Sequence, residues 1–192
     1  MIGASAGGLP ALLEIVGALP ADLETPIAIV LHRTSKPPRL LEGLLGRRSR
    51  LRVVEAVDGG AITPRTIFVA PADRHLSVRY DHTFGLDDGT RIAHVRSSAN
   101  PLFESAAEVF GPAVVGVVLS GSGRNGTRGV RAIKDRGGTV IVQNRATSRF
   151  FEMPSSAIQT GAVDFVLPMD EIASALTVLC TPAAPTTATA LG

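Results

Sequence analysis

The segment IGASAGGLPALLEIVGALPADLETPIAIVLH, residues 2–32, carries the pattern that decides the fold. A glycine-rich loop at residues 3–8 is followed by apolar residues at helical spacing over residues 9–19, and then by a β-branched apolar run at residues 27–31. Helical spacing predicts an amphipathic helix, and a short run that is apolar on both faces predicts a buried strand. Only Met1 and Ile2 precede the loop, so either the first strand is a short stub or the true start lies upstream.

The same alternation continues along the rest of the chain. Short apolar runs predict further strands at residues 51–57, 66–70, 114–119, 139–142 and 163–167. Amphipathic stretches between them predict helices at residues 38–47, 101–110, 127–136, 154–160 and 170–179. Strands that alternate with helices indicate an α/β fold, a doubly wound and mostly parallel sheet with helices on both faces.

One stretch departs from this alternation. Residues 75–84 and 90–95 read as extended segments around Leu86-Asp87-Asp88-Gly89, and an Asp-Gly pair between such segments predicts a β-hairpin. The final residues, 181–192, are Pro, Thr and Ala without a core-forming pattern, so we expect a disordered tail behind one domain at residues 1–180.

Composition excludes several classes of protein. The chain has one cysteine, Cys180, so it has neither a disulfide framework nor a cysteine-based zinc site of its own. No apolar run approaches the roughly 20 residues that span a bilayer, and no signal peptide is visible, so we expect a cytoplasmic protein without membrane insertion. Arg47, Arg48, Arg50 and Arg52 form the densest basic run. Because no aromatic residues interleave it, we expect no nucleic-acid partner, and acidic protein helices fit the run at least as well.

The glycine-rich loop Gly3-Ala4-Ser5-Ala6-Gly7-Gly8 matches G-x-S-x-G, in which a serine sits on a tight turn between a strand and a helix. The N–H groups that open the following helix could stabilise an oxyanion, which makes the backbone of Ala6 and Gly7 candidate donors. A glycine-rich loop before a helix is as often a phosphate cradle. On this motif alone, nucleophile and phosphate site are equally supported.

His32 favours the nucleophile, because it stands at the carboxyl end of the strand predicted at residues 27–31. Ligands of an open parallel sheet bind beyond the carboxyl ends of its strands, so Ser5 and His32 are expected at one rim as nucleophile and general base. The loop Ser120-Gly121-Ser122-Gly123-Arg124-Asn125-Gly126 also follows a strand, and a group that orients the imidazole is expected there. We assign Asn125 to that role, and the backbone near Ser122 and Gly123 to the oxyanion and substrate loop.

These motifs, taken in order, resemble the catalytic domain of the chemotaxis receptor methylesterase family, CheB. The chain order of serine, histidine and then Asn125 differs from that of the α/β-hydrolases. The resemblance covers about residues 2–176. The matching segments are residues 2–8, 30–32, 54–59, 68–76, 97–107, 118–126, 142–143 and 153–167.

The resemblance implies a serine hydrolase that removes methyl esters from chemoreceptor glutamates, and that in many members also deamidates receptor glutamines. It assigns Ser5 as nucleophile and His32 as base, with neither metal nor organic cofactor. Asn125 stands where the family carries the triad aspartate, Ser122 where many members carry Met, and Ala6 where many carry Thr. Implied partners are the cytoplasmic helices of methylated chemoreceptors. Many members begin with a receiver domain that this sequence lacks, so we expect a free-standing member or a fragment, with a receiver domain or kinase acting in trans.

Two alternatives stay open. An asparagine accepts a hydrogen bond from His32 Nδ1–H but supplies no charge to the imidazolium, and the same change in a serine protease lowers turnover roughly 10⁴-fold. The chain is therefore either a weakened esterase or a receptor- or kinase-binding module that has lost the chemistry. A nucleotide-binding domain is disfavoured, because the first loop lacks the lysine of a P-loop and the spacing of G-x-G-x-x-G.

Overall fold

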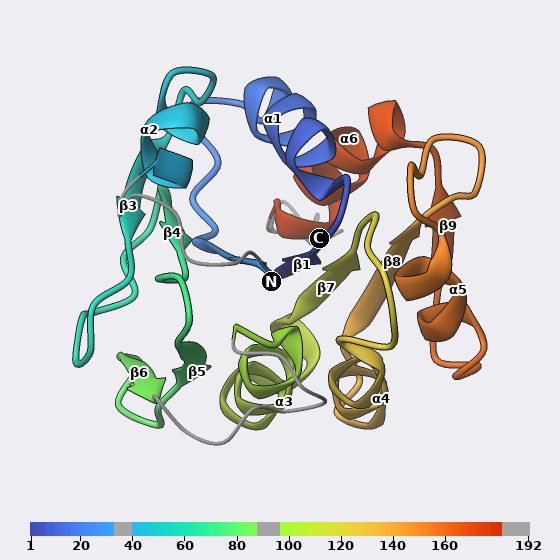
Figure 1. The fold of residues 1–192 in the computed structure, drawn as a ribbon. Helices are drawn as coiled ribbons and strands as arrows, with labels where there is room; N and C mark the ends of the chain where they lie inside the picture. Colours follow the sequence, from blue (N-terminus) through green and yellow to red (C-terminus); the bar gives the residue numbers. More distant parts are fainter. Residues whose placement is uncertain (33–39, 88–96, 182–192) are drawn as a thin grey trace, which may run out of the picture.

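A parallel sheet of seven strands forms the centre of the computed structural model, which describes residues 1–32, 40–87 and 97–181 (Figure 1). The strands lie in the order β3-β4-β2-β1-β7-β8-β9, and every neighbouring pair is parallel. Their bounds are β1 (Ile2–Ala4), β2 (Ile27–Leu31), β3 (Arg52–Glu55), β4 (Thr66–Val69), β7 (Val115–Val118), β8 (Thr139–Gln143) and β9 (Phe165–Leu167). The predicted parallel sheet is confirmed, and its first strand spans three residues.

Helices cover both faces of this sheet, as predicted. In Figure 1, α1 (Gly8–Ala18), α2 (Leu40–Gly46) and α6 (Met169–Cys180) lie above it, and α3 (Ala99–Phe110) and α4 (Thr127–Asp135) lie below. The helix α5 (Glu152–Ile158) packs with α3 and α4 in the lower core, and the short 3₁₀ turn η1 (Gly111–Ala113) follows α3. Residues 38–39 of the second predicted helix lie outside the described residues.

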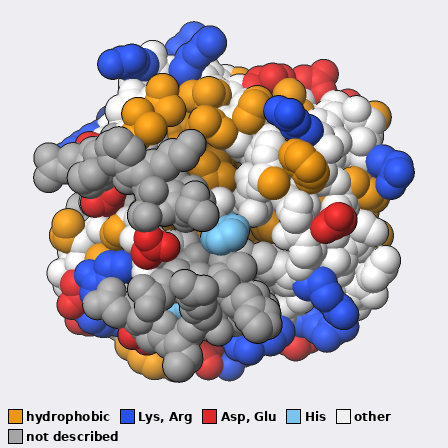
Figure 2. All heavy atoms as spheres, viewed as in Figure 1, with side chains coloured by type: hydrophobic (Ala, Val, Ile, Leu, Met, Phe, Trp, Pro, Cys, Tyr) orange, Lys and Arg blue, Asp and Glu red, His pale blue; other side chains and the backbone are white. Residues whose placement is uncertain are grey.

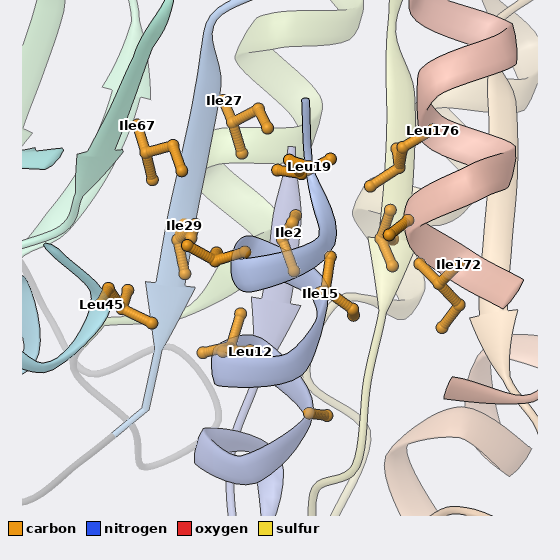
Figure 3. Packing of buried hydrophobic residues seen from close by; sticks show 14 of the residues in the cluster. Ile2, Leu12, Ile15, Leu19, Ile27, Ile29, Leu45, Ile67, Ile172 and Leu176 are labelled. Atoms are coloured by element: carbon orange, nitrogen blue, oxygen red, sulfur yellow. The ribbon is translucent and has the colours of Figure 1, made fainter. Parts of the chain in front are cut away.

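Alternate strand residues feed the two cores, because side chains on a strand point to opposite faces. Ile27 and Ile29 pack with α1 and α6, whereas Ala28 and Val30 pack with α3 on the other face. Figure 3 shows the first core, in which Leu12 and Ile15 of α1 lie among strand residues and Ile172 and Leu176 of α6. Because both faces of these strands are buried, their sequences are apolar at every position.

The chain reverses its direction of travel across the sheet at β1. From β1 it moves to β2, then to β3 at the edge and back to β4 between them, and it later returns to place β7 on the other side of β1. The helix that follows β1 therefore covers one face, and the helix that follows β7 covers the other. Such a switch point opens a crevice at the carboxyl ends of the two strands, where ligands of this class of fold bind.

A separate antiparallel hairpin joins β5 (His75–Val78) to β6 (Phe84–Asp87). A hairpin exists, but the strand expected over residues 75–84 is interrupted. Leu86 and Asp87, expected in a turn, belong to β6, and residues 88–89 of that predicted turn lie outside the described residues. The turn lies at residues 79–83, where Asp81 Oδ1 accepts hydrogen bonds from the backbone N–H and the hydroxyl of Thr83. An aspartate that bonds to backbone two residues ahead initiates a turn as effectively as an Asp-Gly pair does. The arm predicted at residues 90–95 lies outside the described residues.

The start of the chain is held inside the sheet. The Met1 ammonium group donates to the Val115 carbonyl at 2.7 Å, and burial lowers the pKa of this amine to about 6. At the other end, α6 finishes at Cys180. Residues 182–192 lie outside the described residues, so the predicted division into a domain at 1–180 and a tail at 181–192 stays a prediction. Within the described ranges, no helix is both long enough and apolar enough to cross a bilayer.

Candidate active site

Ser5 and His32 meet at the carboxyl edge of the sheet. They follow Ala4 and Leu31, which are partners in the parallel register of β1 and β2, and His32 N–H donates to the Ala4 carbonyl at 2.9 Å. Ser5 Oγ lies 3.2 Å from His32 Nδ1, and both side chains are partly exposed. Figure 2 shows one histidine side chain at the surface near the centre of this view of the molecule. The sequence prediction that these two side chains converge is supported by this contact.

The contact also determines the tautomer that base catalysis needs. Nδ1 can take a proton from Ser5 only if it carries none itself, so the neutral imidazole must carry its hydrogen on Nε2. The sequence-based expectation placed Nδ1–H against Asn125, and the structure instead places Nδ1 against Ser5. A group that orients this imidazole must therefore accept a hydrogen bond from Nε2–H.

Asn125 is engaged elsewhere, as a cap of α3. Its Oδ1 accepts hydrogen bonds from Ser98 Oγ at 2.8 Å and from Ala99 N–H at 2.9 Å. A carbonyl oxygen has two lone pairs, so both are in use, and the Ala99 N–H identifies this atom as the oxygen. The Asn125 Nδ2 group is buried without a hydrogen-bond partner. Among the described residues, Asn125 and His32 form no hydrogen bond with each other.

This cap belongs to an exchange between two neighbouring helices. Asn100 Oδ1, from the first turn of α3, accepts from Gly129 N–H near the start of α4 at 3.0 Å. The asparagine before α4 thus accepts from the start of α3, and the asparagine of α3 accepts from the start of α4. Both bonds satisfy backbone N–H groups that the start of a helix leaves without a partner. Ser98 extends the network, since its N–H donates to Nδ1 of the buried His75 at 3.3 Å.

Ser120 joins the loop after β7 to the loop of Ser5. Its side chain is 1% exposed, and its Oγ donates to the Ala6 carbonyl at 2.9 Å and accepts from Phe150 N–H at 3.0 Å. The Ser120 carbonyl accepts from Ser5 N–H at 3.0 Å, and the Ser120 N–H donates to the side-chain amide oxygen Oε1 of Gln143 at 2.8 Å. Sequence reasoning quoted Ser120 only as part of a glycine-rich loop. The sequence feature that could have identified Ser120 is a hydroxyl directly after a buried strand, because a buried hydroxyl needs a hydrogen-bond partner.

These contacts aim backbone N–H groups away from the protein interior. The Ser5 carbonyl accepts from Gly8 N–H, so the Ala6 N–H of the same trans peptide points the opposite way. In the same manner, the bond from Ser120 Oγ to the Ala6 carbonyl turns Gly7 N–H outward. No described residue accepts from the N–H groups of Ala6, Gly7 or Ser122.

Gly123 differs from the other predicted donors. Its N–H already donates to Glu152 Oε2 at 3.0 Å, so this candidate for the oxyanion loop is corrected: the amide is occupied by a carboxylate. The correction has a local cause, because Glu152 opens α5 and reaches back across the loop. Ala6, Gly7 and Ser122 are the candidates whose N–H groups have no acceptor in the part of the chain that the structure describes.

Two glycines let the loops approach this closely. Gly7 has φ +70°, and a Cβ there would lie 2.9 Å from both Arg149 Cβ and Phe150 Cδ2. A Cβ on Gly121 would lie 2.9 Å from Ser5 Cβ and 2.6 Å from Met153 Sδ. A side chain at either position would therefore displace the nucleophile or its neighbours.

Replacing Ser120 by alanine is expected to lower kcat about tenfold with little change in KM, since the Ala6–Gly7 peptide loses the bond that orients it. Steady-state kinetics on an ester substrate measure this split. Ser120→Thr, which keeps a hydroxyl, should recover most of kcat. Ser49→Ala is the matched control, because it removes a hydroxyl that accepts from Leu51 N–H at the amino end of β3, the far edge of the sheet. Equal kcat values for Ser120→Ala and Ser49→Ala would contradict the positioning role.

No group of three His, Cys, Asp or Glu side chains suitable for a metal ion occurs within the described ranges. The expectation that the chemistry needs neither metal nor organic cofactor stays a prediction.

Comparison with known proteins places this geometry in a family. Residues 1–176 match the family model described as CheB methylesterase. A protein-glutamate methylesterase/protein-glutamine glutaminase 2 of Anaeromyxobacter dehalogenans is 43% identical over 176 residues, which are 92% of this chain and 51% of that protein. The corresponding protein of Caulobacter vibrioides is 40% identical, over 90% of this chain and 51% of its own length. The chain thus spans about half the length of these curated relatives.

Two further similarities cover nearly the whole of both chains. A putative protein-glutamate methylesterase/protein-glutamine glutaminase of Leptospira interrogans is 35% identical over 90% of each chain. The crystal structure of the Thermotoga maritima CheB methylesterase catalytic domain superposes with a TM-score of 0.90 at 35% identity, and covers 93% of this chain and 96% of that one.

Proposed function

The chain belongs to the CheB methylesterase family, and from this premise we propose that it is a protein-glutamate methylesterase, a serine hydrolase with Ser5 as nucleophile and His32 as general base. The observation that carries the proposal is the 3.2 Å contact between Ser5 Oγ and His32 Nδ1. A nucleophile and a base within hydrogen-bond reach, beside free backbone N–H groups, form the minimal set for acyl transfer.

The proposed reaction uses groups of the chain and water. Ser5 Oγ attacks the ester carbonyl of a glutamate side chain while His32 Nδ1 takes the hydroxyl proton. The N–H groups of Ala6, Gly7 and Ser122 stabilise the oxyanion of the tetrahedral intermediate. The C–O bond to the methoxy group then breaks, and His32 returns the proton, so methanol leaves. Water, activated by the same imidazole, releases glutamate from Ser5. Attack on a glutamine side chain by the same steps would release ammonia.

The substrate and partners are part of the proposal. The names of the relatives point to proteins that carry methylated glutamate, so the proposed substrate is the cytoplasmic helices of methylated chemoreceptors, with the cytoplasm as the place of action. A receiver domain or kinase acting in trans is proposed as the regulatory partner.

A second candidate is a receptor- or kinase-binding module without turnover. The observation in its favour is that both lone pairs of Asn125 Oδ1 are occupied by Ser98 and Ala99, and that among the described residues no carboxylate is hydrogen-bonded to His32. Uncharged support lowers the stability of the imidazolium that forms during attack. The same observation, on the leading proposal, predicts slow turnover.

Release of labelled methanol from a protein carrying glutamate γ-methyl esters tests the two candidates. The esterase proposal expects methanol at a slow rate that saturates with substrate, and a large loss of rate in His32→Gln, which removes the base. Arg128→Gln, an exposed change at an ion pair with Glu104, is the control expected to retain the rate. Binding of the methylated protein without methanol release would favour the module.

A further inference from the structure

Two arginine–phenylalanine pairs lie in the segment between β8 and α5. Arg149 places its guanidinium 5.8 Å from the ring centroid of Phe150, and Arg145 places its own 5.4 Å from that of Phe151. We call these four residues the cation–aromatic segment. A guanidinium over an aromatic face is attracted to the ring and keeps its N–H groups available at the edge.

This segment is held next to the nucleophile by its backbone. Phe150 N–H donates to Ser120 Oγ at 3.0 Å, and the Phe150 carbonyl accepts from Gly121 N–H at 3.0 Å. Gly121 in turn lies against Ser5, since a Cβ on Gly121 would lie 2.9 Å from Ser5 Cβ. The segment therefore flanks the loop of Ser5, with its backbone position set by hydrogen bonds rather than by contacts of its own side chains.

The side chains of the segment are directed outward. Phe150 is 40% exposed, and Arg145 and Arg149 are exposed as well. An exposed aromatic ring leaves apolar surface in contact with water, and a bound partner that covers the ring removes that surface from water.

The arginines of the segment form no ion pair among the described residues, as is also true of Arg131 and Arg136, whereas four other cations are paired. Arg65, Arg79, Arg128 and Lys134 each form an ion pair with a carboxylate. No carboxylate in the described ranges pairs with Arg145 or Arg149, nor with Arg124 in the neighbouring loop. Cations left unpaired beside a reactive centre complement an anionic ligand, which they attract and orient.

We propose that the cation–aromatic segment docks the substrate polypeptide through carboxylates that flank the esterified glutamate, with the aliphatic part of the bound chain covering Phe150. The inference rests on the proposed function and adds its substrate class, an acidic polypeptide. An aromatic ring packs the apolar stem of a side chain while the arginine beside it pairs with the charged end of another. Two rings, each stacked with its own arginine, offer fewer free π-faces than a single-stranded nucleic acid uses.

Two synthetic peptides test the proposal, each with one central glutamate γ-methyl ester, flanked by glutamates in one and by glutamines in the other. The wild-type chain is expected to prefer the acidic peptide about tenfold in kcat/KM at low ionic strength, and the preference should shrink as salt is added. Arg149→Glu is expected to abolish or reverse the preference. Phe150→Ser is expected to raise KM for both peptides, because the ring contact does not depend on charge.

Binding measured without turnover separates this proposal from the proposed function. Fluorescence anisotropy of the labelled peptides with the Ser5→Ala chain should show the same preference, and Arg149→Glu in that background should remove it. Acidic-peptide binding without methanol release by the wild-type chain would sink the esterase and support the docking surface. Hydrolysis or binding of both peptides with equal efficiency would overturn the docking surface and leave the esterase.

Arg65→Glu is the matched control, since it makes the same change of charge at an exposed arginine before β4, in the half of the sheet away from β8. It is expected to keep the tenfold preference. An equal loss of preference in Arg65→Glu would overturn the assignment, because the effect would then come from net charge. Tighter binding of a single-stranded oligonucleotide than of the acidic peptide would also overturn it.

Discussion

Replacing Ser5 by alanine is expected to lower the rate of methanol release by at least about 10³-fold, the largest effect of any single change in this chain. The hydroxyl is the only proposed nucleophile, and what remains without it is stabilisation by the N–H groups of Ala6, Gly7 and Ser122. The single-turnover rate measures this effect directly. Mass spectrometry of the quenched wild-type reaction should find the acyl group on the peptide that contains Ser5, and should find none in Ser5→Ala.

The loss must come from the missing hydroxyl and not from a damaged fold. Ser5 is partly exposed and its backbone N–H still donates to the Ser120 carbonyl in the variant, so the midpoint of thermal unfolding should hardly change. Ser155→Ala, which removes a hydroxyl from the surface of α5, is the matched control for an unaffected rate. Undiminished methanol release in Ser5→Ala would end the hydrolase interpretation at this site.

The second large effect is an expected increase in turnover. Asn125→Asp is expected to raise kcat at least about tenfold, since a carboxylate there supplies both an extra acceptor and a negative charge. One oxygen would keep the bonds from Ser98 Oγ and Ala99 N–H that Oδ1 has now. The other would stand where Nδ2 is now buried without a partner, and the gain requires that it accept from Nε2–H of His32, a bond that Asn125 does not make now.

A parallel substitution separates catalysis from capping. Asn100→Asp makes the same chemical change in the other half of the helix exchange, where Oδ1 accepts from Gly129 N–H. A carboxylate near a helix start is favourable in both variants, so both should keep or gain thermal stability. Only Asn125→Asp should gain turnover, as measured by kcat with saturating ester substrate. An equal response of kcat in the two variants would mean that Asn125 acts on α3 alone.

Much of the fold follows from local pattern. Runs such as residues 27–31 and 139–142 could be read as buried strands because each is apolar at every position, and a chain segment carries that information wherever it lies. The meeting of Ser5 with His32 also followed, since residues that end neighbouring parallel strands share an edge. The turn at residues 79–83 did not follow, because Asp81 was read as part of a strand, and only the pairing of His75 with Asp87 places a turn between them.

The assignments that failed or were missed depend on contacts distant in sequence. The occupation of Gly123 N–H requires Glu152, and the role of Ser120 requires both Ala6 and Phe150, which come from the loops after two other strands. No spacing rule connects such residues, because the loops meet only once the sheet has formed.

Sequence by itself determined the layers, the parallel direction of the strands, the glycine-bounded serine and the histidine that meets it. These depend on periodicity and on the ends of strands, which are properties of each segment. Tertiary structure alone decided which nitrogen of His32 faces Ser5, and that the oxygen of Asn125 caps α3. Hydrogen-bond partners are chosen by distance and direction in space, and α3 reaches Asn125 only because it packs beside α4 in the finished fold.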